Sequence, residues 1–164
     1  SKHLKYFTPL TPDMFHVALY NFDRNPDKIR NMRADSLAQC LSFSHVQPGG
    51  KYLVINGIGG LLVGAVLERL GGFGSVHLIH DSDSPPALEL MPQYNLMPFQ
   101  THNVLKTLHW AATEKRGTLA SHMSEELSRE YTSDRERDRA RKKRANIEDF
   151  IATRQQFFEG EFDA

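Results

Sequence analysis

The sequence is poor in cysteine and in long apolar runs. Its one cysteine, Cys40, excludes a disulfide framework and a cysteine metal site. The apolar pattern around Cys40 predicts a small core residue rather than a nucleophile. No apolar run approaches the ~18 residues that a membrane-spanning helix needs, and no signal peptide is visible. We therefore expect a soluble intracellular protein.

Net charge is also absent. The chain has 20 Lys and Arg residues against 20 Asp and Glu residues, so no global field attracts nucleic acid or membrane. Any electrostatic partner must be bound by a local cluster. The 164 residues, of which 40% are hydrophobic, suffice for one domain with a core, or for most of one.

Several catalytic motifs are missing. The sequence contains no H-E-x-x-H, no G-x-S-x-G nucleophile elbow and no P-loop lysine after its glycines. The eight histidines show no metal-ligand spacing. His77 and His80 lie on one predicted strand and would point to opposite faces. We expect no metal site, and each histidine is interpreted as structural or solvated.

The chain is organised around residues 51–70, KYLVINGIGGLLVGAVLERL. Residues 52–55 form a short apolar run, which predicts a strand buried on both faces. Glycines interrupt the pattern, and residues 61–70 are long enough for a helix. A strand that enters a helix through glycines is typical of the opening unit of a nucleotide-binding α/β domain.

The flanking patterns predict the rest of an α/β fold. Residues 75–80 (SVHLIH) predict a second strand, and the helix-filled interval after residue 55 predicts parallel pairing. A third strand is expected within residues 99–110. Residues 11–13 predict a helix start, and Asp35 or Ser36 is expected to cap a second helix with Leu37, Cys40, Leu41 and Phe43 on its apolar face. The patterns therefore predict an α/β fold of the nucleotide-binding type, a parallel-type sheet with flanking helices.

These patterns also divide the chain. Residues 1–12 are expected to link to a preceding domain, residues 13–112 to form the first part of the Rossmann-like domain, and residues 113–132 to form a mobile loop. Residues 133–160 predict a long helix that begins with the capping box S-x-x-E. A doubly wound sheet usually has more strands than these, so we expect the C-terminal strands of the domain to be missing after residue 164, either absent or on another polypeptide.

The glycine turn is a poor cofactor fingerprint. The candidate G-x-G-x-x-G frame that starts at Gly57 ends at Leu62 instead of glycine. Bulky Leu61 and Leu62 enter the helix at once, and we expect them to fill the crevice that a cofactor would need. Asp81 follows the second strand, where an acid can bind ribose hydroxyls. The alternative is that Asp81 caps a turn in its D-S-D-S-P-P loop, and we favour that interpretation.

Basic residues cluster in two places. Arg24, Lys28, Arg30 and Arg33 lie in or beside the run KIRNMR. This cluster is either a solvated helix entry or a contact for phosphate or a partner. In the long helix, the first half carries seven cations: Arg135, Arg137, Arg139, Arg141, Lys142, Lys143 and Arg144. Its second half is amphipathic, with Ile147, Phe150, Ile151, Arg154 and Phe158 on one face, so we expect the basic half to project and the apolar half to dock.

Four segments carry a family resemblance. Residues 28–39, 48–54, 59–72 and 80–86 closely resemble the non-catalytic subunit of the tRNA N1-methyladenosine methyltransferase that acts on the T-loop, in a fungal-like form. The resemblance covers most of residues 1–110 and resumes at about residues 146–163. Its most specific part is the run G-G-L-L-V-x-A-x-L-E-R-x-G-G.

The resemblance implies a Rossmann-like methyltransferase fold, incomplete in this chain, that has no catalytic residues and has lost binding of S-adenosylmethionine. Asn56 takes the place of the acid that precedes the glycine turn in active relatives. The degenerate site then comprises the following residues: Asn56, Gly57, Gly59, Gly60, Leu61, Leu62 and Asp81. The cofactor is expected on a catalytic partner subunit, in a two-plus-two heterotetramer that binds tRNA. In the family, a β-barrel domain precedes this segment.

The basic helix and the glycine turn leave alternatives open. The cations of the helix either neutralise tRNA phosphates or belong to a mobile charged insertion. The basic cluster also resembles a nuclear-import signal, so we expect the protein to be located in the nucleus. A rival function is an active S-adenosylmethionine-dependent methyltransferase with an atypical turn that uses Asp81 for the ribose. A third is an assembly surface without RNA contact.

Overall fold

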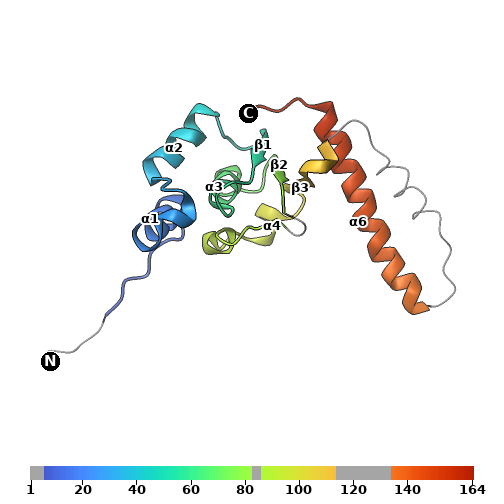
Figure 1. Ribbon diagram of the computed structural model, residues 1–164, viewed down its shortest axis with the longest axis horizontal. Coiled ribbons are helices and arrows are strands. Elements are labelled where there is room, and N and C mark those ends of the chain that lie inside the picture. The colour runs from blue at the N-terminus through green and yellow to red at the C-terminus, as the bar shows by residue number, and fades with distance from the viewer. Residues whose placement is uncertain (1–5, 83–85, 114–133) are drawn as a thin grey trace.

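The computed structural model describes residues 6–82, 86–113 and 134–164, and side chains of the last segment from residue 137 (Figure 1). The expected loop at residues 113–132 and the capping box at Ser133 therefore lie almost entirely outside the described residues. No helix within the described ranges combines the length and the apolar character that a membrane span requires.

The centre of the fold is a parallel sheet. Its strands in the described residues are β1 (Lys51–Ile55), β2 (Ser75–His80) and β3 (Leu105–His109), in the order β1-β2-β3. Lys51 pairs with Ser75 and Val76 pairs with Leu105. The parallel direction and the helix between β1 and β2 confirm the Rossmann-like α/β class.

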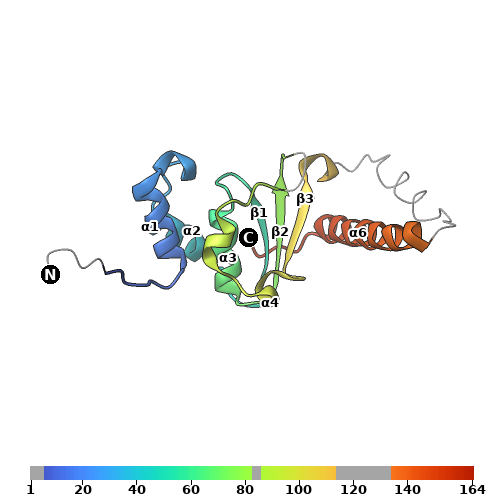
Figure 2. The same ribbon diagram turned by 90° about the horizontal axis from the view of Figure 1, so that it is seen from below.

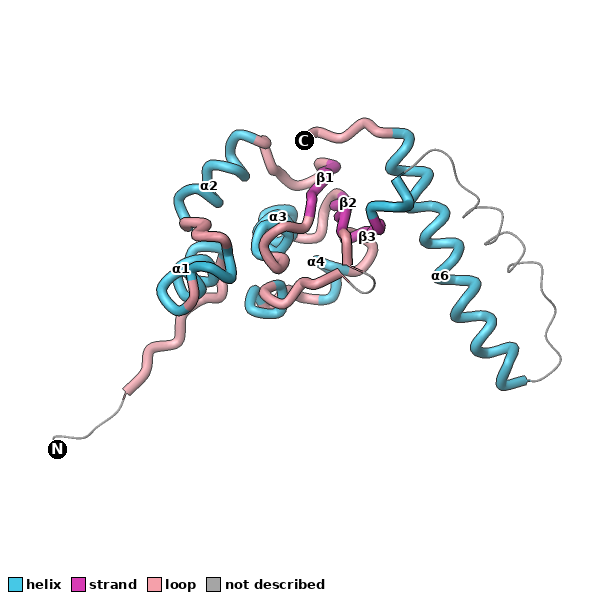
Figure 3. The backbone as a smooth tube through the Cα atoms, viewed as in Figure 1, coloured by secondary structure: helices cyan, strands magenta, loops and turns pink. Residues whose placement is uncertain are grey.

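Helices cover both faces of this sheet (Figures 1 and 2). On one side lie α1 (Met14–Arg24), α2 (Ala34–Phe43) and α3 (Leu61–Leu70), and on the other lies α6 (Asp134–Glu159). Short helical turns connect these elements, as the tube in Figure 3 shows: η1 (Pro26–Ile29), η2 (Met91–Tyr94), α4 (Pro98–Thr101) and η3 (Trp110–Thr113).

The core is built around α3. Its charged residues are Glu68 and Arg69, and seven of its ten residues are buried, because helices pack on one side of it and the sheet on the other. A smaller cluster lies on the opposite face, where Phe150 and Phe157 of α6 pack against Ile79, Leu108 and Ala112. Phe150 therefore docks as expected and Ile147 is buried, whereas Ile151 of the expected face is exposed and Phe157 packs in its place.

Strand β1 is not buried on both faces, so that expectation is wrong. Tyr52 and Val54 point into the core, whereas Leu53 is 36% and Ile55 73% exposed. The physical reason is the position of α6, which packs mainly over β3 and reaches β1 at Lys51, at one end of that strand. The described residues leave the outer face of β1 largely uncovered.

Helix α2 differs from expectation in two ways. Its N-cap is Arg33, and Asp35 lies in the first turn, where Arg33 binds its carboxylate at 2.9 and 3.0 Å. Leu37 and Leu41 are buried as expected, but Cys40 and Phe43 are exposed and are therefore not core residues. The apolar stripe of α2 is narrower than its sequence suggests, because α2 contacts the core along one edge.

The last residues run along the free side of β1. The backbone N–H of Leu53 donates to the Ala164 carbonyl oxygen at 2.8 Å, and the N–H of Asp163 donates to the Lys51 carbonyl oxygen at 2.8 Å. Residue numbers rise together along both segments, so the two run in the same direction. Gly160, with φ at 70°, ends α6 as expected and lets the chain turn back to the sheet.

Candidate functional site

The glycine turn between β1 and α3 takes a left-handed backbone. Gly59 has φ of 61° and Gly60 has φ of 87°, a region that side-chain-bearing residues rarely adopt. Gly60 is the N-cap of α3. The turn therefore keeps the backbone shape that the strand–turn–helix pattern predicts, and the question is what lies against it.

The segment that follows β2 lies directly on this turn. The backbone N–H of Leu90 donates to the Gly59 carbonyl oxygen at 2.9 Å. A β-carbon at Gly60 would come within 3.1 Å of the Leu88 α-carbon, and one at Gly59 within 3.5 Å of the Leu90 side chain. The glycines accordingly make room for the chain itself. Leu88 and Leu90 are the residues that sequence reasoning missed, and the one local signal is their apolar character after the D-S-D-S-P-P loop.

Asn56 joins the same two segments. Its side-chain amide donates to the Ala87 carbonyl oxygen at 3.1 Å, while its Oδ1 is buried and has no hydrogen-bond partner among the described residues. An aspartate at this position would place a carboxylate against that carbonyl oxygen, and neither group can donate. The amide therefore fits a closed turn where an acid would not.

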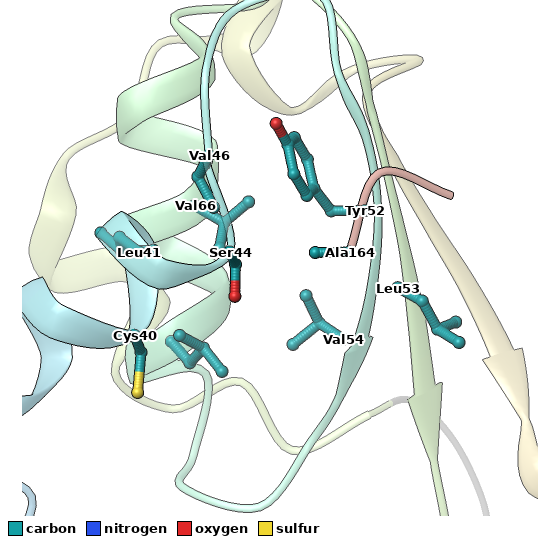
Figure 4. Close-up of a pocket in the computed structure, with 10 residues that line it drawn as sticks. Cys40, Leu41, Ser44, Val46, Tyr52, Leu53, Val54, Val66 and Ala164 are labelled. Atoms are coloured by element: carbon teal, nitrogen blue, oxygen red, sulfur yellow. The ribbon is translucent and has the colours of Figure 1, made fainter. Parts of the chain in front are cut away.

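The two leucines expected to fill the crevice lie elsewhere. Leu61 is completely buried in the core. Leu62 faces an apolar cavity of about 200 Å³ between α2, α3 and β1. In Figure 4, Tyr52 and Val54 of β1 project toward this cavity and Ala164 lies at its β1 side. The expectation was wrong in its residues, because the side chains against the glycines belong to Leu88 and Leu90.

The end of β2 carries Asp81, which is exposed. The neighbouring His80 is buried, its Nδ1 lies 3.1 Å from the Ser82 carbonyl oxygen, and its ring meets His109 edge to face at 5.5 Å. Among the described residues, no group of three metal-binding side chains comes together. The structure thus brings Asp81 to the expected edge of the sheet.

The cations near η1 have local partners. Arg24 donates to the Tyr20 hydroxyl at 2.6 Å, Lys28 pairs with Glu89 at 3.0 Å, and Arg33 binds Asp35. Arg30 is exposed and has φ of 50°. Three of the four cations are therefore engaged with partners within the chain.

The cations of α6 form a separate surface. Arg137, Arg139, Arg141, Lys142 and Lys143 are exposed and Arg144 is half-buried, whereas the side chain of Arg135 lies outside the described residues. Figures 1 and 2 show α1 and α6 on opposite sides of the sheet. The structure does not bring the two basic segments together.

Comparisons with known proteins agree on one family. A family model described as the Gcd10p family matches residues 1–148. The relative named tRNA (adenine(58)-N(1))-methyltransferase non-catalytic subunit trm6, from Schizosaccharomyces pombe, is 29% identical over 170 residues, which cover 99% of this chain and 37% of the relative.

Two further relatives have the same name, with the symbol written TRM6. The mouse protein is 37% identical over 84 residues, or 51% of this chain and 17% of the relative. The protein of the yeast Debaryomyces hansenii is 29% identical over 110 residues, or 66% of this chain and 23% of the relative. The chain thus spans less than half the length of these relatives. Because the family model covers residues 1–148 of 164, this chain belongs to the Gcd10p family.

Proposed function

We propose that this chain is part of the non-catalytic subunit of a tRNA (adenine-N1)-methyltransferase. Its methyltransferase-like domain supports a catalytic partner subunit and contributes to holding tRNA. Membership of the Gcd10p family and the names of the relatives support this role. The fold alone does not identify this function, because one fold serves many activities, so the geometry of the site has to support it.

The closed glycine turn carries the proposal. Leu88 and Leu90 occupy the space against Gly60 and Gly59, and Asn56 binds the covering segment through the Ala87 carbonyl. Nucleotide-binding turns of this kind need glycines so that the ligand can approach the backbone. These residues do not fit S-adenosylmethionine, which we therefore assign to the catalytic partner.

Calorimetry tests this assignment. Titration of S-adenosylmethionine into the isolated full-length subunit gives no heat of binding, whereas titration into the complex with the catalytic subunit gives one. Micromolar binding to the isolated subunit, weakened by Asp81→Asn, would instead favour the rival function of an active methyltransferase that uses Asp81 for the ribose.

The assembly is a heterotetramer of two catalytic and two non-catalytic subunits. The family resemblance supports this stoichiometry, and native mass spectrometry of the co-expressed complex measures it. A mass equal to one copy of each subunit would reject the tetramer while leaving the pairing itself intact.

The basic half of α6 contributes to tRNA binding. Three of its exposed cations, Arg139, Arg141 and Lys142, lie on a helix that projects from the sheet (Figure 1). Each phosphate that a cation neutralises changes the slope of log affinity against log salt by about 0.9 for a duplex. Replacing all three with Gln lowers that slope by about 2 to 3 in filter-binding assays with tRNA.

A matched control uses cations that are already paired. Replacing Lys28 and Arg33 with Gln removes charge from the opposite side of the sheet and leaves the salt slope unchanged. An unchanged slope in the α6 variant would remove the tRNA role of this helix.

The location that we propose is the nucleus, and a fluorescent fusion that stays nuclear when Lys142 and Lys143 become Gln would separate import from RNA binding.

A further inference from the structure

A groove lined by several polar side chains lies between α6 and β3. Its volume is about 560 Å³, and residues of α4, β3 and α6, with the turn between the first two, line it. The turn contributes exposed His102 and Asn103, β3 contributes Lys106 and Thr107, and α6 contributes Asn146. Figure 2 shows α6 leading away from the sheet next to β3, with α4 at one end of the strands.

The groove continues into the basic half of α6. Helix residues three or four positions apart lie on the same face. Arg139 and Lys142 therefore share a face with Asn146 and Asp149, and both cations are exposed. A ligand in the groove extends along this face toward two positive charges.

The lining chemistry favours an anionic, hydroxyl-bearing ligand. Lys106 spans the groove from β3 and binds the Asp149 carboxylate of α6 at 3.1 Å, so the one carboxylate in the lining is paired with a cation. The amides of Asn103 and Asn146 and the hydroxyl of Thr107 each offer a donor and an acceptor. Side chains of these types contact phosphates and sugars in nucleic-acid complexes.

We propose that this groove binds the sugar–phosphate backbone of one RNA strand. The phosphates lie toward Arg139 and Lys142, and the ribose 2′-hydroxyls meet Asn103, Thr107 and Asn146, since that hydroxyl both donates and accepts. This inference rests on the proposed function and gives tRNA a defined surface at the α6–β3 junction.

The rival occupant is a β-strand from a protein partner. Within the described residues β3 has a single strand neighbour, β2, and a free strand edge can accept another strand. However, this edge strand carries Lys106, which pairs with Asp149 of α6 at 3.1 Å. A lysine on an edge strand is also a feature that discourages strand addition, so the chemistry favours RNA.

The first test introduces one negative charge into the groove. Asn146→Asp keeps the size of an exposed side chain, and Gln39→Glu makes the same amide-to-acid change on α2, across the sheet. In the full-length protein with its catalytic partner, Asn146→Asp weakens tRNA affinity about fivefold at low salt, because a charge near a phosphate costs about that much in water. Gln39→Glu leaves the affinity unchanged.

A photo-crosslink identifies the occupant independently. Benzophenone-alanine at exposed Thr107 crosslinks to tRNA in the assembled complex. A crosslink to a partner protein, or equal affinities for Asn146→Asp and Gln39→Glu, would overturn the groove proposal. If the unaltered complex bound no tRNA at all, the proposed function itself would fail, which is a different result from RNA binding that ignores the groove.

Discussion

The ring of Tyr94 lies directly against Gly64, in the middle of α3. A β-carbon at residue 64 would overlap the ring, and the Tyr94 hydroxyl donates to the Leu61 carbonyl oxygen at 2.7 Å. Burial raises the pKa of Tyr94, so the hydroxyl stays protonated and remains a donor. This contact fixes η2 on α3 and with it the segment that covers the glycine turn.

Gly64→Ala is therefore expected to destabilise the protein although it favours the helix. Alanine gains at most about 1 kcal/mol of helix propensity over glycine, whereas a methyl group forced into a packed core costs about 1 to 3 kcal/mol. We expect a net loss of about 1 to 2 kcal/mol in the free energy of unfolding, measured by urea denaturation. Arg69→Ala at an exposed position of α3 is the control, and a stabilised Gly64→Ala would show that the Tyr94 ring moves freely.

Gly60→Ala tests how tightly the covering segment is held. The substitution meets a left-handed φ of 87° and the Leu88 backbone at 3.1 Å, so we expect a loss of about 1 to 3 kcal/mol. Gly57 in the same turn has open space around its α-carbon, and Gly57→Ala is expected to change stability by about 0.5 kcal/mol or less. Equal effects at the two glycines would mean that Leu88 leaves the turn in solution.

Local sequence patterns predicted the buried elements well. The ranges expected for the central helix and for the strand after it coincide with α3 and β2, because continuous apolar runs between glycines have few alternatives. Exposure was harder to predict. Leu53, Ile55 and Cys40 occur in apolar patterns but are exposed, because the placement of α6 and α2 decides which faces are covered.

The candidate site at the glycine turn shows more clearly that local sequence patterns do not predict tertiary contacts. The glycine turn is recognisable in the sequence, but the inference that it is degenerate rested on Leu61 and Leu62, which lie elsewhere, and on the family resemblance at Asn56. The side chains against the turn come from Leu88 and Leu90, about 30 residues later in the chain. No periodicity reports such a contact, because it depends on how the segment after β2 folds back across the sheet edge.

Lys51 anchors the end of α6 to β1. Its ammonium donates to the carbonyl oxygens of Gly160 at 2.6 Å and Gln156 at 3.1 Å and lies 4.7 Å from the centre of the Phe162 ring. A cation at a helix C-terminus also interacts favourably with the helix dipole. Lys51→Met is expected to cost about 1 to 2 kcal/mol of unfolding free energy.

Lys28→Met is the matched control for that prediction. Lys28 pairs with Glu89 at 3.0 Å, and both side chains are largely exposed, so its removal is expected to cost about 0.5 kcal/mol or less. If the two lysine variants lost the same stability in urea denaturation, the anchoring role of Lys51 would be rejected.

His77 should make stability depend on pH below neutrality. Its ring is 1% exposed and meets Phe162 edge to face at 5.3 Å, and burial together with the Lys51 ammonium lowers its pKa from 6.5. Below pH 6.5 the unfolded chain therefore binds a proton at His77 more readily than the folded chain does. The contribution of His77 to the free energy of unfolding is present at higher pH and is lost as the pH falls from 6.5. His77→Phe is expected to reduce the pH dependence of the unfolding free energy over this range. The control His102→Phe changes an exposed ring and leaves the pH dependence unchanged. A pH dependence that persists in His77→Phe would assign it to another group.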